Sequence, residues 1–355
     1  MTPLSGLLAF LAHDYVPRAV GRRWDALVPV TLQGCFALII GERPNDPEIA
    51  EFLERLHRTG SRPPLVIVAG PKNTPWTAHA ERQTGVDGLI FTDARAEHQI
   101  HAFRLLAGNT TDRTIAQSDP AIARIWTRTK DVVHDLTARI RAGQPIPRAD
   151  VQALATSVVE TLDSSALTDF LALLRQHHAE SVVHGLDVGI TALLLGRHIG
   201  VRRKADELRL FETGLLHDVG KLAMPLPILQ KPGKLTDEET AVIQRHPIES
   251  EKILRHSGAY DDLVIRAAVQ HHERLDGTGY PHHLPADGIH DLSRLIAVCD
   301  VFCALTEHRS YRPKQTPEDA VPILRDMSGN HLDPIYVERL IELVNGDTLP
   351  PKAAA

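Results

Sequence analysis

The hydrophobic residues of the chain follow two different patterns, one in each half. In the first half, residues 35–40 (CFALII), 64–69 (PLVIVA) and 88–91 (GLIF) are short apolar runs typical of buried strands, and residues 48–58 place apolar residues at helical spacing. Strands that alternate with helices predict a parallel sheet covered on both faces. From residue 148 onward the spacing is helical almost throughout, which predicts an all-α region.

A single amphipathic helix is predicted between the two regions. Asp119 and Pro120 are typical of an N-cap and a first helical position, and Gly143 ends the pattern. Apolar residues three and four apart form a narrow stripe, made of Ile122, Ile125, Thr129, Val132, Leu136 and Ile140. The stripe suits a two-stranded coiled coil or packing on the chain's own domain, and fewer than three heptads do not distinguish these. We therefore expect domains at 1–110 and 148–355, with a linker helix in 111–147.

Composition narrows the class of protein. The 355 residues suggest two or three domains, and 43% hydrophobic content is ordinary for a globular chain. A net charge of −6 argues against binding of long nucleic acid but allows a small anionic ligand in a cleft with local cations. The three cysteines form no CxxC pair, no apolar run approaches the roughly 20 residues of a membrane span, and the start lacks a basic leader. We expect a cytoplasmic protein with no membrane contact.

Histidines and acidic residues in the second half suggest a metal site. The candidates are Glu180, His184, His217, Asp218, His246, His271, His272 and Asp300. Residues 211–217 (FETGLLH) form an apolar helix end that would bury His217 and Asp218, where an unpaired carboxylate is costly and a metal removes that cost. Imidazole and carboxylate donors suit Zn, Fe, Mn or Ni. Seven donors other than Glu180 suit two ions that share a carboxylate, which we assign to Asp218, and paired ions are typical of phosphoester hydrolysis.

The sequence around these residues resembles the HD-GYP family of HD phosphohydrolases. The matching segments are HDVGK (217–221), ILQKPGKLT (228–236), HHERLDGTGYP (271–281) and a DVF…ALT segment that begins at Asp300. The similarity covers about residues 150–345 and implies a helical HD-type domain. It also implies metal-dependent hydrolysis of cyclic di-GMP to pGpG, GMP or both, by a metal-bound hydroxide.

The resemblance also implies the ligand set and the metals. The H…HD…D pattern of HD phosphohydrolases and the additional histidines of the HD-GYP group match His184, His217, Asp218, Asp300, His246, His271 and His272. Glu180 lies four residues before His184, on the same helical face, where some family members have a glutamate that binds a third metal. The alternative for Glu180 is an exposed helix residue. We expect two or three divalent ions, with Fe or Mn favoured.

Four residues are predicted on the substrate side. Lys221 follows Asp218 by three positions, so it can contact the scissile phosphate, assist the leaving oxygen or pair with Asp218. Tyr280 stands in a glycine-rich loop, where its ring or hydroxyl could meet a guanine or a phosphate. Arg309 and Arg312 match the family's positions that hold phosphate and guanine, a task that suits the planar guanidinium, although they could equally be surface residues.

Two positions depart from the family pattern. Cys303 stands where members of the DVFDALT type have an aspartate that contacts a guanine edge, and a thiol cannot accept from guanine N–H groups in its place. Ser310 replaces a proline, which should loosen that turn slightly. These departures leave two alternatives to the enzyme that cleaves cyclic di-GMP. One is a catalytically weak module that binds cyclic di-GMP or a partner protein and signals through helix 119–142. The other is an enzyme for a different cyclic dinucleotide or nucleotide, because the HD constellation alone does not specify the base.

The first half resembles a receiver domain over roughly residues 30–108, in the order of its elements. The residues of phosphoryl transfer are not at their expected places, where the chain has Gly41 or Glu42, Ala69 or Gly70, and Thr92 or Asp93. We therefore expect a degenerate receiver that accepts no phosphoryl group, with an unrelated α/β module for dimerisation or sensing as the alternative. The resemblances imply cyclic di-GMP as ligand and a diguanylate cyclase or other signalling proteins as partners. The coiled-coil alternative for the apolar stripe predicts a homodimer through helix 119–142.

Overall fold

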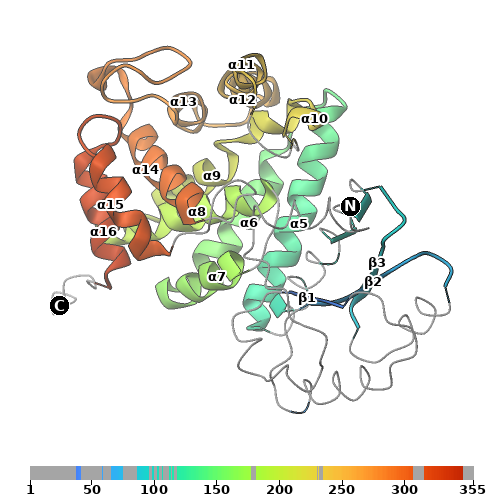
Figure 1. The fold of residues 1–355 in the computed structure, drawn as a ribbon. Helices are drawn as coiled ribbons and strands as arrows, with labels where there is room; N and C mark the ends of the chain where they lie inside the picture. Colours follow the sequence, from blue (N-terminus) through green and yellow to red (C-terminus); the bar gives the residue numbers. More distant parts are fainter. Residues whose placement is uncertain are drawn as a thin grey trace. The chain divides into compact units, whose positions relative to one another are not determined.

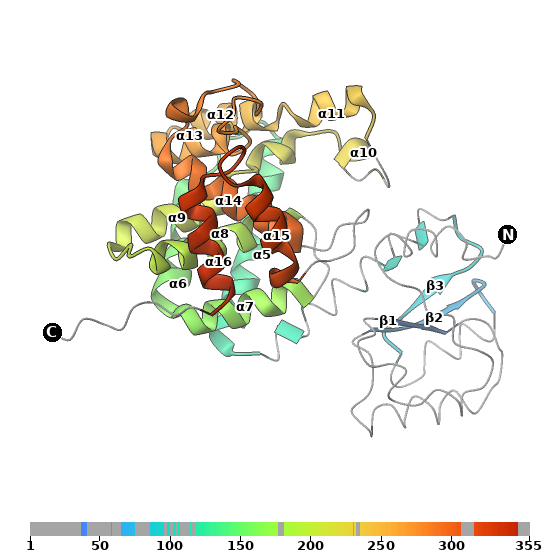
Figure 2. The ribbon, with the colours of Figure 1, turned by 60° about the vertical axis from the view of Figure 1, so that its left-hand side comes forward.

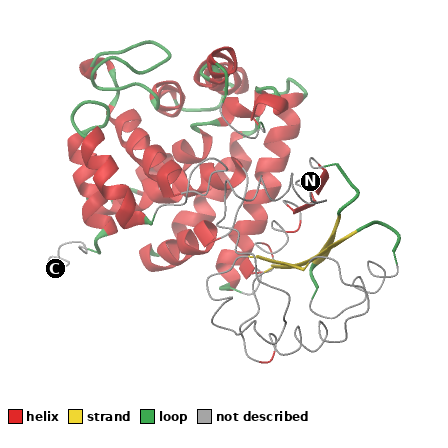
Figure 3. Cartoon of the chain, in the orientation of Figure 1, coloured by secondary structure: helices red, strands yellow, loops and turns green. Residues whose placement is uncertain are grey.

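The computed structural model separates the chain into two compact units, Met1–Thr114 and Ile115–Ala355, which are described one by one. The structure describes residues 37–40, 58, 65–74, 86–95, 98–99, 102–103, 106, 112, 114–115, 118–176, 181–229, 231, 235–306 and 316–346. Figure 3 shows that the described strands belong to the first unit, while the described part of the second unit is helical.

A parallel sheet forms the centre of the first unit. Its strands β1 (Ala37–Ile40), β2 (Leu65–Gly70) and β3 (Gly88–Phe91) lie in the order β1-β2-β3 (Figure 1). The middle strand β2 is buried along its whole length, as its continuous apolar run predicts. Leu65 and Ile67 pack with Ile90 and Phe103 in the unit's core.

The three strand predictions are confirmed, and the sheet is compatible with a receiver-like domain, which stays a prediction. Gly41 and Glu42 lie outside the described residues, as does all but Arg58 of the predicted helix 48–58. Past the end of β3, Asp93 accepts a hydrogen bond from the backbone N–H of Lys72 (3.1 Å).

Helices build the described part of the second unit. They are α5 (Pro120–Arg141), α6 (Arg148–Thr161), α7 (Ser164–Gln176), α8 (Ser181–His198), α9 (Lys204–Leu216), the 3-10 turn η3 (Val219–Ala223), α10 (Leu226–Leu229), α11 (Asp237–Ile243), α12 (His246–Ser257), α13 (Asp262–Gln270), the 3-10 turn η4 (Ala286–Gly288), α14 (Asp291–Thr306), α15 (Pro317–Met327) and α16 (Pro334–Val344). The predicted all-α character of this region is confirmed. Of the described helices, none combines the length and apolar character that a membrane crossing needs.

The core of this unit is the contact between α8 and α9, which glycines bring close together. A Cβ atom added at Gly214 would lie 2.5 Å from the Cα of Gly189, and one at Gly185 would lie 2.7 Å from the carbonyl oxygen of Leu215. These positions therefore tolerate no side chain. Helices α14 and α16 pack against α8, and Figure 2 shows α14, α15 and α16 side by side.

Helix α5 packs on its own unit. Its apolar stripe is buried in one core cluster with residues of α6, α8 and α9, and α5 also contacts η3. Asp119 caps the helix by accepting from the N–H of Ala121 (2.6 Å), as predicted. The face that the sequence offers to a coiled coil is therefore covered by the chain itself. The predicted division into domains 1–110 and 148–355, with a linker helix in 111–147, stays a prediction.

An ion pair between a partly exposed arginine and a buried glutamate ties the start of α6 to α9. The guanidinium of Arg148 donates from Nε to Oε1 of Glu212 (2.9 Å) and from Nη2 to Oε2 (3.0 Å). Glu212 is 3% exposed, and it lies on α9 one turn before its end. Nearby, Ser257 accepts from the N–H of Ile146 (3.0 Å). These bonds fix the segment after α5 to the two helices that lead to the histidine cluster described below.

We expect Glu212→Gln to lower the free energy of unfolding by about 1–2 kcal/mol, because it leaves the partly exposed Arg148 charge without its buried partner. The matched control is Glu251→Gln, which breaks the exposed pair between Glu251 and Arg255 (2.8 Å) and should cost less than about 0.5 kcal/mol. Urea denaturation of both variants measures the difference. Equal effects would show that the Arg148–Glu212 pair contributes nothing beyond a surface pair.

Candidate metal centre

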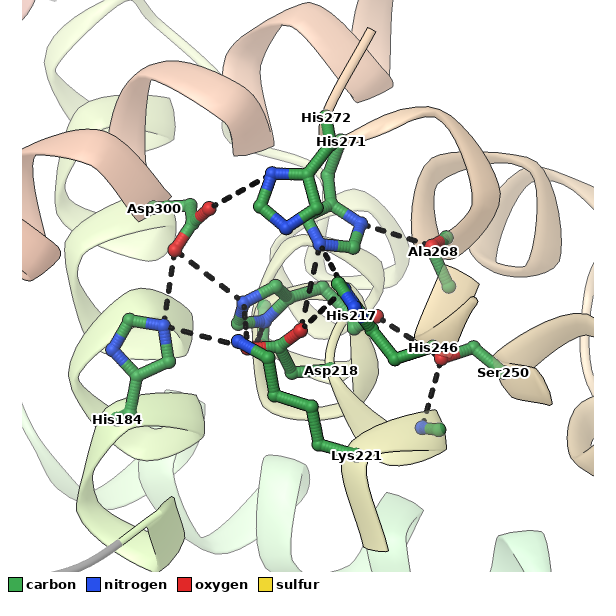
Figure 4. Close-up of polar contacts among 12 residues, drawn as sticks. His184, His217, Asp218, Lys221, His246, Ser250, Ala268, His271, His272 and Asp300 are labelled. Carbon is green, nitrogen blue, oxygen red and sulfur yellow. Dashed lines mark hydrogen bonds and ion pairs between the residues drawn. The ribbon is translucent and has the colours of Figure 1, made fainter. Parts of the chain in front are cut away.

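Seven predicted ligands from distant parts of the sequence meet inside the helical unit (Figure 4). They are His184 on α8, His217 and Asp218 after α9, His246 at the start of α12, His271 and His272 after α13, and Asp300 on α14. Subsets of three and four of these residues have donor atoms that all lie within 4.8 Å of one another. Glu180, Arg309 and Arg312 lie outside the described residues.

The two carboxylate oxygens of Asp218 face different imidazoles. Oδ1 lies 3.0 Å from Nε2 of His246 and 3.5 Å from Nε2 of His271. Oδ2 lies 3.3 Å from Nε2 of His217 and 3.7 Å from Nε2 of His184. One carboxylate therefore separates two groups of nitrogen donors, which is the arrangement that two ions sharing a ligand require.

The second carboxylate, Asp300, lies across the cluster from Asp218. Its Oδ1 is 3.0 Å from Nε2 of His184 and 3.7 Å from Nε2 of His217, while Oδ2 is 3.9 Å from Nδ1 of His272. Asp300 and Asp218 thus approach His184 and His217 from two sides. His272 completes the group that contains His246 and His271.

Backbone carbonyls orient three of the imidazoles in the same way. Nδ1 of His217 donates to the carbonyl oxygen of Gly214 (2.7 Å), that of His246 to Ile243 (2.7 Å) and that of His271 to Ala268 (2.9 Å). Each acceptor lies three residues earlier, at a helix end, and a carbonyl can only accept. Nε2 of each ring therefore points to the centre, which is the usual orientation of a metal-bound histidine.

Two buried polar atoms of the cluster lie close to other ligands but make no hydrogen bond of suitable geometry among the described residues. They are Nε2 of His217 and Oδ1 of Asp218. Buried polar groups are almost always satisfied, because leaving one unpaired has a large desolvation penalty. A cation at the centre would satisfy both atoms, so the residues fit divalent ions.

The electrostatics of the cluster favour positive charge at its centre. Burial lowers the pKa of His271 to about 4 and that of His272 well below its usual value, so both rings are neutral at pH 7. Burial acts to raise the pKa of Asp218, but Lys221 and His217 outweigh it and hold the pKa well below its usual range. Burial acts to lower the pKa of His217, but Asp218 and Asp300 outweigh it and raise the pKa to about 9. The carboxylates thus attract positive charge to the centre.

Lys221 and Tyr280 lie at the edge of the cluster. Nζ of Lys221 donates to Oδ2 of Asp218, and its side chain is 28% exposed. The ring of Tyr280 lies against His272, with centroids 4.7 Å apart and planes at 31°. Burial raises the pKa of Tyr280 above its usual value, so its phenol is neutral.

Ser250 is a contact residue that sequence reasoning missed. Its Oγ accepts from the N–H of Gly220 (2.8 Å) and donates to the carbonyl oxygen of His217 (3.4 Å), so it ties α12 to the HDVGK segment. A Cβ at Gly220 would lie 2.0 Å from the carbonyl oxygen of His246, which explains the glycine. Its spacing in the sequence could have indicated this contact, because Ser250 lies one helical turn after the predicted ligand His246.

Cys303 lies in the packing between α14 and α8. It is fully buried on α14, and its Sγ lies 3.4 Å from Oγ1 of Thr191 on α8. A small apolar thiol suits that interior position, where an unpaired carboxylate would be costly. The absence of an aspartate at 303 therefore has a packing explanation.

Comparison with known proteins identifies relatives of this region. A family model described as HD domain matches residues 166–335. A cyclic di-GMP phosphodiesterase of Pseudomonas aeruginosa is 33% identical over 233 residues, which are 62% of this chain and 53% of the relative. A 3'3'-cGAMP-specific phosphodiesterase of Vibrio cholerae is 45% identical over 125 residues, covering 35% of this chain and 29% of the relative.

A further relative is a cyclic di-GMP phosphodiesterase response regulator of Xanthomonas campestris, 39% identical over 140 residues, or 38% of this chain and 36% of the relative. The chain thus spans about half or less of the length of these curated relatives. A solved HDG"Y"P protein from Bdellovibrio bacteriovorus superposes with a TM-score of 0.52 at 18% identity. That match covers 70% of this chain and 80% of the other, and it shows a shared fold.

Removal of divalent ions with a chelator should lower the melting temperature of the wild-type protein. An ion that binds only the folded state stabilises it by about 2.7 kcal/mol at 100 times its Kd. Asp218→Asn should abolish most of this difference, because an amide offers one oxygen where the carboxylate offers two. His256→Ala, at an exposed position of α12, should preserve it. Thermal melts with Mn(II) and after chelation test this, and equal melting temperatures for wild type would contradict a metal centre.

Proposed function

We propose that this chain, whose residues 166–335 match the HD domain family model, is a metal-dependent phosphodiesterase that hydrolyses cyclic di-GMP to pGpG, GMP or both. The observation that supports this best is the position of Asp218, whose two oxygens each face two imidazoles. Relatives named cyclic di-GMP phosphodiesterases support the substrate class.

The seven described ligands would hold two divalent ions. When bound, such a pair supplies an activated water and neutralises the negative charge that grows on the phosphorus oxygens. Fe or Mn fits the nitrogen and oxygen donors. Glu180 would hold a third ion, a proposal that the family resemblance alone supports.

The protein's own residues have separate tasks in this proposal. Asp218 lies between the two groups of nitrogen donors and sets their separation. The hydrogen bonds of His217, His246 and His271 to backbone carbonyls keep their rings from turning. The Lys221 ammonium, next to Asp218 and partly exposed, binds the scissile phosphate and neutralises its charge.

The remaining proposed contacts lie on the nucleotide side. Tyr280, packed on His272, presents its ring to a guanine base or its hydroxyl to a phosphate. Arg309 and Arg312 bind phosphate and guanine, a proposal that rests on the family resemblance.

Signalling proposals concern the first unit and α5. We infer a degenerate receiver that takes no phosphoryl group, with a diguanylate cyclase or another signalling protein as partner. Because the apolar stripe of α5 is buried within the second unit, a homodimer through helix 119–142 would use the other face of that helix.

A second candidate substrate comes from the comparisons. One of the relatives is named as 3'3'-cGAMP-specific, at 45% identity, so a mixed cyclic dinucleotide is a defined alternative. A third candidate function is the catalytically weak module that binds cyclic di-GMP or a partner protein. The same assay separates all three.

Protein reconstituted anaerobically with Fe(II) or Mn(II) should convert cyclic di-GMP, with products separated by chromatography. Lys221→Met should keep its metal and lose about 100-fold in kcat, because the phosphate loses a cation at the reacting centre. Lys252→Met is the control, since Lys252 is exposed on α12 and paired with Glu249 (2.7 Å).

Three other results are informative. Faster turnover of 3'3'-cGAMP would favour the mixed dinucleotide. Binding without turnover at full metal occupancy would favour the non-catalytic module. An unchanged kcat in Lys221→Met would remove Lys221 from the proposed mechanism.

A further inference from the structure

Glu273 is a buried acid that directly follows the two ligands His271 and His272. It is 3% exposed. Its Oε1 accepts from the backbone N–H of His282 (2.7 Å), and its Oε2 accepts from the N–H of Leu284 (3.0 Å). Both oxygens of the carboxylate are therefore used to hold backbone that lies nine and eleven residues further along the chain. Bonds from N–H groups to a charged carboxylate are about twice as strong as neutral ones.

The loop between these positions folds back on the turn that contains Glu273. The N–H of Tyr280 donates to the carbonyl oxygen of His272 (3.1 Å), and the N–H of Gly277 donates to that of Arg274 (2.9 Å). A Cβ at Gly279 would lie 2.4 Å from the Cα of Glu273, so only glycine permits this approach. Residues 277–284 thus wrap around Glu273, with Tyr280 inside the wrapped segment.

The wrapped loop determines where the Tyr280 ring lies. The ring packs on His272, with centroids 4.7 Å apart, and also approaches His246 at 6.3 Å. Tyr280 itself is held by the bond from its N–H to the carbonyl oxygen of His272. The residues that follow it are held by the two bonds to Glu273. Because the bonds after Tyr280 depend on the Glu273 charge, the ring's position depends on it too.

We propose that Glu273 is a positioning residue that holds the loop 277–284, and with it the Tyr280 ring, against the metal ligand His272. It thereby sets the face of the site that receives the nucleotide, a part of the proposal that rests on the proposed function. The carboxylate acts through the loop, and it contacts neither a metal ligand's imidazole nor a reacting atom among its described bonds.

A second anchor makes this role separable from folding. Oε1 of Gln270 accepts from the N–H of His290 (3.0 Å) and from Oγ of Ser293 (2.9 Å), so the far end of the segment is held independently of Glu273. Loss of the Glu273 charge should therefore release residues 280–284 and leave the helices intact.

The test is Glu273→Gln, which keeps the size of the side chain. Its single carbonyl oxygen can accept from one of the two N–H groups, and its NH2 group opposes the other. Hydrogen exchange at the amides of His282 and Leu284 should quicken about tenfold or more. Metal content should stay at the wild-type level, KM for cyclic di-GMP should rise about tenfold, and kcat should change less than about threefold.

Two further variants control the experiment. Asp287→Asn removes an exposed carboxylate from η4, just after the loop, and should leave exchange and kinetics unchanged. Glu273→Asp keeps the charge on a shorter side chain, so it should restore part of the protection and part of the affinity.

The outcomes are distinct. Unchanged exchange at residues 282 and 284 in folded Glu273→Gln would overturn the proposal. Faster exchange with an unchanged KM would overturn its nucleotide part. Absence of turnover in metal-loaded wild type would instead defeat the proposed function, while the exchange comparison would still decide whether Glu273 holds the loop.

Discussion

The buried carboxylate of Asp218 is the constraint on which the helical unit depends. Removing an ionised group from water has a penalty of several kcal/mol, and that penalty must be offset by opposite charge and good geometry. Here four imidazoles and the Lys221 ammonium surround one carboxylate. The helices are arranged so that their ends meet around it, and a core of this kind is stable only when positive charge is present at its centre.

Helix ends and close helix contacts together produce this geometry. His217 and His271 follow the last turns of α9 and α13, where a free carbonyl three residues earlier accepts from Nδ1. Gly185 and Gly214 let α8 approach α9, which sets the separation of His184 from His217. The fold therefore orients these donors through its own backbone hydrogen bonds and helix contacts.

The spacing of apolar residues predicted the helices and strands well, because it depends on residues that are close together in the sequence. The three strands and the helical second half follow from apolar spacing, and the motif spacing singled out the seven residues that the structure brings together. Contacts between distant residues did not follow. The bonds of Ser250 to Gly220 and of Glu273 to His282 and Leu284 produce no periodic pattern in the sequence. The apolar stripe of α5 did not show which helices it packs against. The sequence also did not show that Cys303 is buried, because its burial comes from the packing of α14 on α8.

The most direct test of the central claim is to count divalent ions in the protein. Anaerobically purified and reconstituted protein, analysed by plasma mass spectrometry, should contain about two ions per chain at the described ligands. A count near three that falls by one in Glu180→Gln would add the third site. Less than one ion per folded chain, after incubation with Fe(II), Mn(II) or Zn(II), would contradict the assignment of the cluster as a metal centre.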